Sequence, residues 1–209
     1  MSDVLVVGIS GGSAAGKTTF TTALVKALDP LPVVTLNQDR YFRDWEDVPE
    51  DQREAARTSN HPRAVLWETL TAHVNALKQG EGITVPIPGT RAMKRGETPT
   101  NIQSGPLIVV EGHLIFNHEP LRALMDVKVF LDVDTHERVL RRMLRDTTKG
   151  NMNLEQAVAW YRRDVMPNYP VHTEPTRKFA DLIVPFEGEV DRAIEVVANG
   201  IRGMVTKAG

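Results

Sequence analysis

The segment Gly11–Thr18 constrains the fold of this chain more than any other part of its sequence. Its residues, Gly-Gly-Ser-Ala-Ala-Gly-Lys-Thr, fit the pattern G-x-x-x-x-G-K-[ST]. An apolar run, Val4–Ile9, precedes the segment, and a helical pattern, Lys17–Leu28, follows it. A glycine-rich loop between a buried strand and a helix presents a row of backbone N–H groups to an anion. The sequence therefore predicts a phosphate-binding loop on an α/β scaffold.

The residue types in this loop suit the binding of a nucleoside triphosphate. Gly11 and Gly16 allow the sharp backbone turns that point N–H groups inward. Lys17 is expected to reach the β- and γ-phosphates, and Thr18 to offer its hydroxyl to Mg²⁺. The guanine-binding signature N-K-x-D of GTPases is absent, so ATP is the expected donor, with GTP as the alternative. The expected ATP-binding residues are Gly11, Gly12, Ser13, Ala14, Ala15, Gly16, Lys17, Thr18 and Thr19.

Five apolar runs are predicted to form strands. They are nearly continuous, as strands covered by helices on both faces are, and they are Val4–Ile9, Pro32–Leu36, Leu107–Val110, Val127–Val133 and Asp181–Val184. Helical patterns lie between them at Lys17–Leu28, Ala64–Lys78, Asp134–Asp146, Asn153–Val165 and Glu189–Met204. Asp134 followed by Glu137 has the spacing of a capping box. The alternation predicts an α/β fold with a doubly wound parallel sheet.

Two long stretches interrupt this alternation. The 209 residues suit a single domain, 1–209. Residues 40–105 are charged and contain many Pro and Gly residues, and residues 135–177 carry helix but little apolar core. We expect the first stretch to form an acceptor-binding cap insertion and the second to form a lid.

Composition excludes several classes of function. The net charge is −2, which disfavours a nucleic-acid or membrane-surface binder because such proteins normally carry a basic excess. The chain has no cysteine, so disulfides and thiolate chemistry are excluded. Its apolar runs are shorter than a membrane span requires. We therefore expect a cytoplasmic protein that acts on a small molecule and is able to form homo-oligomers.

Two carboxylates follow predicted strands at the edge of the sheet where ligands bind. Asp39 lies just past the second strand, where a carboxylate accepts a proton from an attacking hydroxyl. Glu111 ends the third apolar run and is placed to hold Mg²⁺ through water or to orient an acceptor. The alternatives are a turn or N-cap role for Asp39 and a solvent-facing charge for Glu111.

Four arginines fall on one face of the helix predicted after Asp134. Their spacing is i, i+3, i+4 and i+7, and they are Arg138, Arg141, Arg142 and Arg145. Like charges on one face repel each other unless anions neutralise them. A triphosphate would do so, and positive charge beside the transferred phosphoryl group favours its transfer. The alternative is a solvated face that pairs with Glu137 and Asp146.

Aromatic residues follow Asp39 directly. Tyr41, Phe42 and Trp45 are able to stack on a nucleobase, and they are equally plausible as packing residues. The histidines His61, His113, His118 and His136 lack the spacing of a metal site.

Taken in order, these motifs resemble the uridine kinase and phosphoribulokinase branch of P-loop kinases. The resemblance covers nearly the whole chain. It rests on Gly11–Thr18, Gln38–Phe42, Asn60–Pro62, Val110–Gly112, Arg141–Asp146 and Glu174–Asp181. The segment from Arg141 to Pro185 is especially similar to uridine–cytidine kinases.

The resemblance implies a P-loop NTPase fold with a five-stranded parallel sheet, a small β-hairpin cap over the acceptor and a helical lid. It also implies ATP-dependent phosphorylation of the 5′-hydroxyl of a nucleoside, best expected to be uridine or cytidine. Asp39 would be the catalytic base, and Thr18 and Glu111 would bind the metal. The remaining expected catalytic residues are Lys17, Arg142 and Arg145. The expected substrate-binding residues are Asp39, Tyr41, Asn60, His61 and Glu111.

The chain departs from the uridine kinase pattern on the acceptor side. Asn60 stands where the family has an Asp that holds ribose hydroxyls. Pro88 and Met93 replace the Tyr and His that contact the pyrimidine, and Gly150 and Met152 replace lid arginines. A site selects strongly only through the polar groups it must satisfy. These changes leave the identity of the acceptor open.

A second resemblance widens the choice of acceptor. The segment from Gly112 to Asn117 and the following Glu119-Pro120-Leu121 are similar to nicotinamide riboside kinases. Nicotinamide riboside and another sugar-like alcohol are therefore alternative acceptors. An alternative of another class is a nucleotide-binding regulator that transfers no phosphate, and such a protein would not need a base at Asp39.

Overall fold

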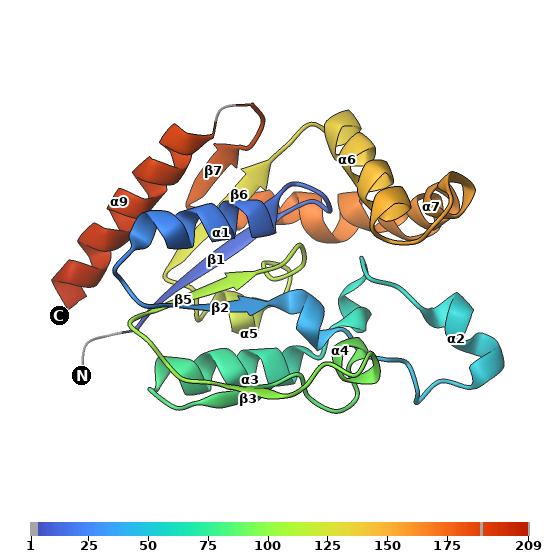
Figure 1. Ribbon diagram of the computed structural model, residues 1–209, viewed down its shortest axis with the longest axis horizontal. Coiled ribbons are helices and arrows are strands. Elements are labelled where there is room, and N and C mark those ends of the chain that lie inside the picture. The colour runs from blue at the N-terminus through green and yellow to red at the C-terminus, as the bar shows by residue number, and fades with distance from the viewer. Residues whose placement is uncertain (1–3, 189, 209) are drawn as a thin grey trace.

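One sheet sets the framework of the molecule. The computed structural model describes residues 4–188 and 190–208. Within these residues, five parallel strands pair in the order β2-β5-β1-β6-β7 (Figure 1). Their bounds are Leu5–Gly11 (β1), Val33–Asn37 (β2), Leu107–Glu111 (β5), Val127–Asp132 (β6) and Leu182–Pro185 (β7). The five predicted strands are confirmed, with ends that differ by at most two residues.

Helices cover both faces of the sheet, and successive strand residues pack into opposite layers (Figure 1). Val6 packs in the layer that contains α3 (Trp67–Lys78). Val7 packs in the layer that contains α1 (Lys17–Leu28) and α9 (Asp191–Ala208). Both valines are fully buried. The strands are continuous apolar runs because each of their faces lies in a core layer.

Most predicted helices have the expected place but different ends. The helix α1 has the predicted bounds. The helix α3 begins at Trp67 instead of Ala64, because Pro62–Ala64 forms a separate 3₁₀ turn. The helix α9 ends at Ala208 rather than Met204, and its predicted first residue, Glu189, lies outside the described residues.

The helix α6 (Thr135–Thr148) begins at the predicted cap. The Asp134 carboxylate accepts hydrogen bonds from the backbone N–H groups of His136 and Glu137. The reciprocal half of the predicted capping box is wrong. Glu137 instead forms an ion pair with Arg141, and the N–H of Asp134 donates to Glu187.

The predicted helix Asn153–Val165 is only partly α-helical. The helix α7 covers Leu154–Trp160, and a π-helical turn, η3 (Tyr161–Val165), follows it. Pro167 then supplies no N–H group, so it cannot continue an α-helical hydrogen-bond ladder. The chain continues through α8 (Met166–Asn168) and two further turns, η4 (Tyr169–Thr173) and η5 (Glu174–Phe179).

Residues 40–105 contain the hairpin that the family resemblance implies. Strands β3 (Ile83–Val85) and β4 (Thr100–Ile102) pair antiparallel, and α4 (Arg91–Lys94) lies in their connection. The helix α2 (Glu50–Ala56) belongs to the same stretch. Short helix α5 (Glu119–Arg122) follows β5.

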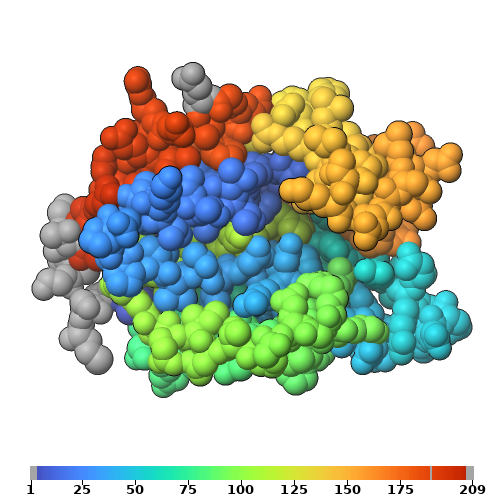
Figure 2. Space-filling model, in the orientation of Figure 1, coloured from blue at the N-terminus to red at the C-terminus, as the bar shows by residue number. Residues whose placement is uncertain are grey.

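The cap and lid elements extend beyond the carboxyl ends of the strands. Figure 1 shows α6 and α7 on one side of this end of the molecule and α2 and α4 on the other. In Figure 2 the surfaces of these two groups adjoin, and Arg163, which follows α7, forms an ion pair with Glu54 of α2 at 2.9 Å. Among the described helices, none is both long and apolar enough to cross a membrane.

Candidate functional site

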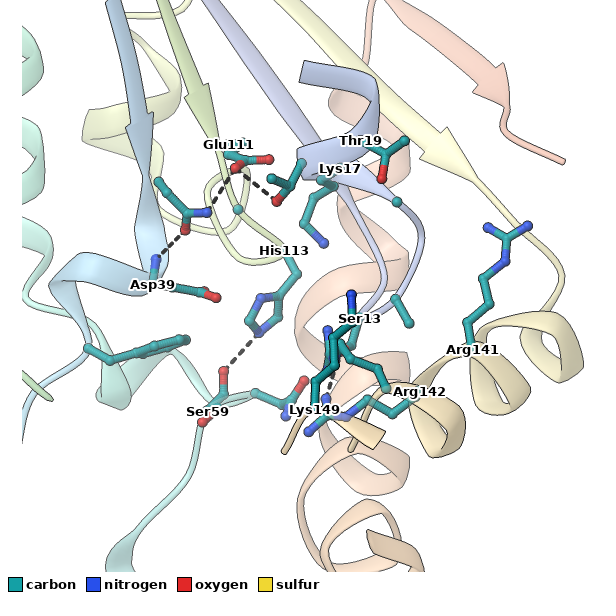
Figure 3. Close-up of a pocket in the computed structure, with 18 of the residues that line it drawn as sticks. Ser13, Lys17, Thr19, Asp39, Ser59, Glu111, His113, Arg141, Arg142 and Lys149 are labelled. Atoms are coloured by element: carbon teal, nitrogen blue, oxygen red, sulfur yellow. Dashed lines mark hydrogen bonds between the residues drawn. The ribbon is translucent and has the colours of Figure 1, made fainter. Parts of the chain in front are cut away.

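A cavity of about 770 Å³ opens at the carboxyl ends of the strands, between the cap and the lid (Figure 3). Its wall combines the loop between β1 and α1 with the ends of β2 and β5. It also includes side chains from the β3–β4 connection and from α6. The carboxyl edge of a parallel α/β sheet is where such folds bind ligands.

The loop after β1 has the conformation of an anion-binding turn. Gly11 and Gly16 have φ angles of 145° and 86°, which residues with a side chain rarely adopt. Six of the expected ATP-binding residues line the cavity: Ser13, Ala14, Gly16, Lys17, Thr18 and Thr19. The other three, Gly11, Gly12 and Ala15, lie behind this wall and are buried.

Lys17 folds back on the loop. Its Nζ donates hydrogen bonds to the carbonyl oxygens of Gly11 and Gly12, at 3.0 and 2.9 Å. Burial lowers the pKa of Lys17 to about 8, and the charges of Asp39 and Glu111 partly oppose this shift. Because the nearby carboxylates offset the loss of hydration only in part, the positive charge of Lys17 is available to bind an incoming phosphate.

Glu111 is the centre of a hydrogen-bonded cluster at the end of β5. Its Oε1 accepts from Thr18 Oγ1 at 3.0 Å and from Asn37 Nδ2 at 2.8 Å, and Thr21 Oγ1 lies 3.3 Å from Oε2. Burial raises the pKa of Glu111, although the bond from Thr18 and the charge of Lys17 act in the opposite direction. Thr18 and Glu111 thus bring two oxygen ligands together.

Asp39 lies in the 3₁₀ turn η1 (Gln38–Tyr41) directly after β2. Its backbone N–H donates to Asn37 Oδ1 at 2.7 Å. Figure 3 shows its carboxylate directed into the cavity, on the side of Lys17 and His113. Asn37 therefore links Asp39 to Glu111, a role that the sequence analysis missed although Asn37 ends a predicted strand.

The predicted arginine stripe divides into two parts. Arg141, Arg142 and Arg145 line the cavity. Arg138 does not, because its side chain is buried, donates to the carbonyl oxygen of Val133 and lies 4.0 Å from the ring centroid of Tyr169. The expectation of one continuous cationic face is therefore wrong at Arg138.

Arg142 shows features of both hypotheses made for the stripe. It pairs with Asp146 at 2.5 Å and also donates to Ser13 Oγ at 2.7 Å, whereas Arg145 pairs with Asp146 at 3.1 Å. Both guanidinium groups are thus paired with a carboxylate, and that of Arg142 also contacts the phosphate-binding loop. Lys149, which follows α6, adds another positive charge to the wall.

The opposite wall contains residues that the sequence analysis did not name. Arg91 and Arg95 reach it from the β3–β4 connection, and Ser59 reaches it from the loop after α2. Phe42, which was considered for stacking on a base or for packing, also lines this wall. Arg91 donates to Ser59 Oγ at 2.8 Å. Burial lowers the pKa of Arg91 to about 10, assisted by the charge of Arg57.

His113 is also in this wall. Its Nε2 lies 2.8 Å from the carbonyl oxygen of Ser59, so Nε2 carries the proton and donates it. Burial lowers the pKa of His113 to about 3, and the charge of Lys17 adds to this effect. The imidazole is therefore neutral at physiological pH.

Among the expected substrate-binding residues, Asp39, Asn60 and Glu111 line the cavity, whereas Tyr41 and His61 do not. Tyr41 is 1% exposed, and its hydroxyl lies 2.9 Å from His73 Nδ1 on α3. The ring of His61 packs against His172 with a centroid distance of 4.5 Å. The turn η1 points Tyr41 into the core and leaves Phe42 at the cavity.

The positions that replace pyrimidine and lid contacts are also away from the cavity wall. Pro88 and Gly150 are exposed, and Met93 and Met152 are half-buried outside the lining residues. Ser59, Asn60, Arg91 and His113 line the cavity, whereas these four positions do not.

Comparisons with known proteins agree with this geometry. The sequence profile of the Phosphoribulokinase / Uridine kinase family matches residues 6–193. A uridine kinase from Limosilactobacillus reuteri is 33% identical over 205 residues, which cover 98% of this chain and 94% of the relative. A uridine kinase from Deinococcus deserti is 34% identical over 197 residues, which cover 94% and 95%.

A solved structure shows the same fold. The putative fructose transport system kinase from Silicibacter sp. TM1040 superimposes with a TM-score of 0.65, at 21% identity, over 88% of this chain and 91% of that one. At this identity the likeness concerns the fold alone. The match over 6–193 and the full-length relatives show that this chain belongs to the phosphoribulokinase / uridine kinase family.

Proposed function

We propose that this protein is a kinase that transfers the γ-phosphoryl group of ATP to the 5′-hydroxyl of a nucleoside, with uridine or cytidine as the acceptor. One observation carries the proposal: the Asp39 carboxylate shares a single cavity with Lys17 and Thr18 of the phosphate-binding loop. A phosphate-binding loop alone fits any nucleotide-binding protein, whereas a carboxylate facing it fits a kinase with an alcohol acceptor. The relatives named uridine kinase, at 33 and 34% identity, support the choice of nucleoside.

In this proposal the phosphate-binding loop forms the part of the cavity that binds ATP. Its N–H groups and the N-terminus of α1 bind the phosphates, and the Lys17 ammonium leaves the carbonyl oxygens of the loop for the β- and γ-phosphates. Arg142 and Arg145 are placed to neutralise the charge that spreads over the transferred group. The cation-rich lid wall thus faces the bonds that change.

Asp39 supplies the proton acceptor for the reaction. The 5′-oxygen of the acceptor forms a bond to the γ-phosphorus while the bond from phosphorus to the β–γ bridging oxygen breaks. The hydroxyl proton passes to the Asp39 carboxylate, and ADP leaves. Asn37 orients this carboxylate through the hydrogen bond from the Asp39 N–H group.

The donor set also fits Mg²⁺, which we include in the proposal. Mg²⁺ prefers oxygen ligands and keeps several waters while it contacts one or two protein groups and the phosphates. Thr18 Oγ1 and Glu111 Oε1, 3.0 Å apart, offer such a pair. Bound there, Mg²⁺ would neutralise phosphate charge.

A second candidate is a kinase of another sugar-like alcohol. The observation in its favour is that Pro88 and Met93 do not line the cavity, so no base-reading side chain reaches it from those positions. Nicotinamide riboside fits less well, because Arg91 and Arg95 would face its positively charged ring.

Initial rates of ADP release test the proposal directly. The assay uses ATP and Mg²⁺ with uridine, cytidine, adenosine, nicotinamide riboside and simple sugars in turn. We expect stimulation by uridine or cytidine, and Asp39→Asn is expected to abolish it while ATP binding persists. Bound ATP without stimulation by any acceptor would contradict the proposal and favour a nucleotide-binding regulator.

A further inference from the structure

The loop Thr58–His61 at the acceptor wall is held by separate parts of the fold. From the cap, Arg91 donates to Ser59 Oγ at 2.8 Å and to the carbonyl oxygen of Thr58 at 2.5 Å. From the end of β5, His113 Nε2 donates to the Ser59 carbonyl oxygen at 2.8 Å. These contacts fix the backbone of the loop but do not touch the side chain of Asn60.

The lid supplies the third support through Asp164. This residue lies in the π-helical turn η3, and it is only 2% exposed. Its Oδ2 accepts from the Ser59 N–H at 2.9 Å and from Asn60 Nδ2 at 2.7 Å, and its Oδ1 accepts from the Thr58 hydroxyl. All these donors are neutral groups of one loop, more than one hundred positions earlier in the chain. A buried carboxylate needs such donors to offset the loss of its hydration.

This contact determines which atom of Asn60 faces the cavity. Rotating the amide by 180° would place its Oδ1 against the Asp164 carboxylate, so that two hydrogen-bond acceptors would meet. The Nδ2 group is therefore committed to Asp164. Because Asn60 lines the cavity, its Oδ1 is the side-chain atom left for a ligand. That oxygen accepts no hydrogen bond from any residue in the described part of the chain.

We propose that Asp164 is a positioning residue of the acceptor site, which orients the Asn60 amide so that Oδ1 accepts a hydrogen bond from a hydroxyl of the acceptor. The inference rests on the proposed function. The pair presents an accepting oxygen at the cavity with a negative charge directly behind it. Asn60 and Asp164 together thereby provide an accepting oxygen and a negative charge, which a single carboxylate at position 60 would provide alone.

The alternative is that Asp164 only stabilises the lid against the loop. The two roles differ in what an exchange of the side chains would do. In Asn60→Asp/Asp164→Asn, the amide at 164 donates to the carboxylate at 60, which still turns an accepting oxygen to the cavity, although the Ser59 N–H group loses its acceptor. In Asn60→Asp alone, two carboxylates meet at hydrogen-bond distance and repel each other. A positioning role predicts rescue by the exchange.

The experiment compares Asp164→Ala, Asn60→Asp and the exchanged double variant with the wild type. The KM for uridine, the KM for ATP and kcat are measured by ADP release, and thermal unfolding checks that each variant is folded. We expect each single variant to raise the KM for uridine by about tenfold or more, the effect of losing a charge-assisted hydrogen bond. The KM for ATP is expected to stay within about twofold, since the donor wall is untouched. The exchange should bring the KM for uridine below that of Asn60→Asp but not fully back to the wild-type value, because the Ser59 N–H group loses its acceptor.

Two results would overturn the inference alone: a wild-type KM for uridine in folded Asp164→Ala, or a double variant no better than Asn60→Asp. If Asp164→Ala does not fold, the comparison of the double variant with Asn60→Asp decides the inference. A wild-type protein that turns over no nucleoside overturns the proposed function and this inference together, so the two failures are distinguishable.

Discussion

Arg142 of the lid donates a hydrogen bond from Nη1 to the Ser13 hydroxyl of the phosphate-binding loop, at 2.7 Å. Its Nε is held at the same time by Asp146, at 2.5 Å. The guanidinium group is thus oriented from behind by a carboxylate and directed forward to the loop. This contact joins α6 directly to the phosphate-binding loop.

From this contact we predict that Arg142→Ala lowers kcat more than it weakens ATP binding. The charge on the transferred group spreads in the transition state, so a cation there stabilises it more than the ground state. Loss of one such group costs about 10²-fold in kcat. The check is a comparison of kcat from ADP release with ATP affinity from equilibrium binding.

Arg141→Ala is the matched control for this prediction. Arg141 also lines the cavity, but it pairs with Glu137 and makes no described contact with the phosphate-binding loop. We expect a smaller loss of kcat than in Arg142→Ala. An effect of Arg142→Ala that appears only in ATP affinity would contradict the role given to the lid.

The parts of the site that adjoin strands were predictable from the sequence. The loop Gly11–Thr18 and Glu111 each follow an apolar run directly, so a parallel sheet places both at its carboxyl edge. Asn37 ends β2 and carried the same signal. Asn37 was missed because an amide side chain two residues before Asp39 suggests no chemistry of its own.

The cap and lid contributions were not predictable in this way. Arg91 lies in a connection without periodicity, and contacts with residues far away in the sequence hold it beside Ser59, because its backbone N–H donates to the Phe42 carbonyl oxygen. Asp164 and Ser59 are 105 residues apart, so no local pattern joins them. For Tyr41 the error was the reverse: it was expected at the site but lies in the core. The direction of a single 3₁₀ turn decides whether an aromatic side chain faces a ligand or the core.

The second prediction concerns the charge of Lys17. Its pKa in the free protein is about 8, so the ammonium group loses its proton as the pH rises through this value. We expect kcat/KM for ATP to fall above pH 8, because this parameter reports the free protein. The value of kcat should fall less, since bound phosphates raise the pKa of Lys17 again. Rates at pH 6.5 to 9.5 with saturating acceptor provide the measurement.

Lys17→Ala is the control, with turnover lowered by about 10²-fold or more and no such step near pH 8. Loss of a folded structure through the titration of Lys17 does not explain a fall in activity above pH 8. Between pH 8 and 10.5 the unfolded chain keeps a proton on Lys17 that the folded protein has released, so this group makes stability rise with pH. An identical step in Lys17→Ala would assign the titration to another group.

The third prediction concerns acid stability and His113, whose buried imidazole has its pKa lowered from 6.5 to about 3. As the pH falls through 6.5, the unfolded chain binds a proton that the folded protein excludes. The free energy of unfolding therefore decreases with falling pH until about pH 3, by about 1.4 kcal/mol per pH unit. His113→Gln removes this titration and still offers an N–H donor to the Ser59 carbonyl oxygen.

Between pH 7.5 and pH 5, we expect the wild type to lose about 2 kcal/mol of unfolding free energy beyond the loss in His113→Gln. Denaturant titrations of both proteins at the two pH values measure this difference. His136→Gln is the matched control, because His136 is exposed at the start of α6 and its imidazole has no described hydrogen bond. It separates the effect of the imidazole at position 113 from the effect of replacing a histidine elsewhere on the protein. Equal losses in His113→Gln and the wild type would mean that the imidazole of His113 takes up a proton in the folded protein, and that its contact with Ser59 does not hold it neutral.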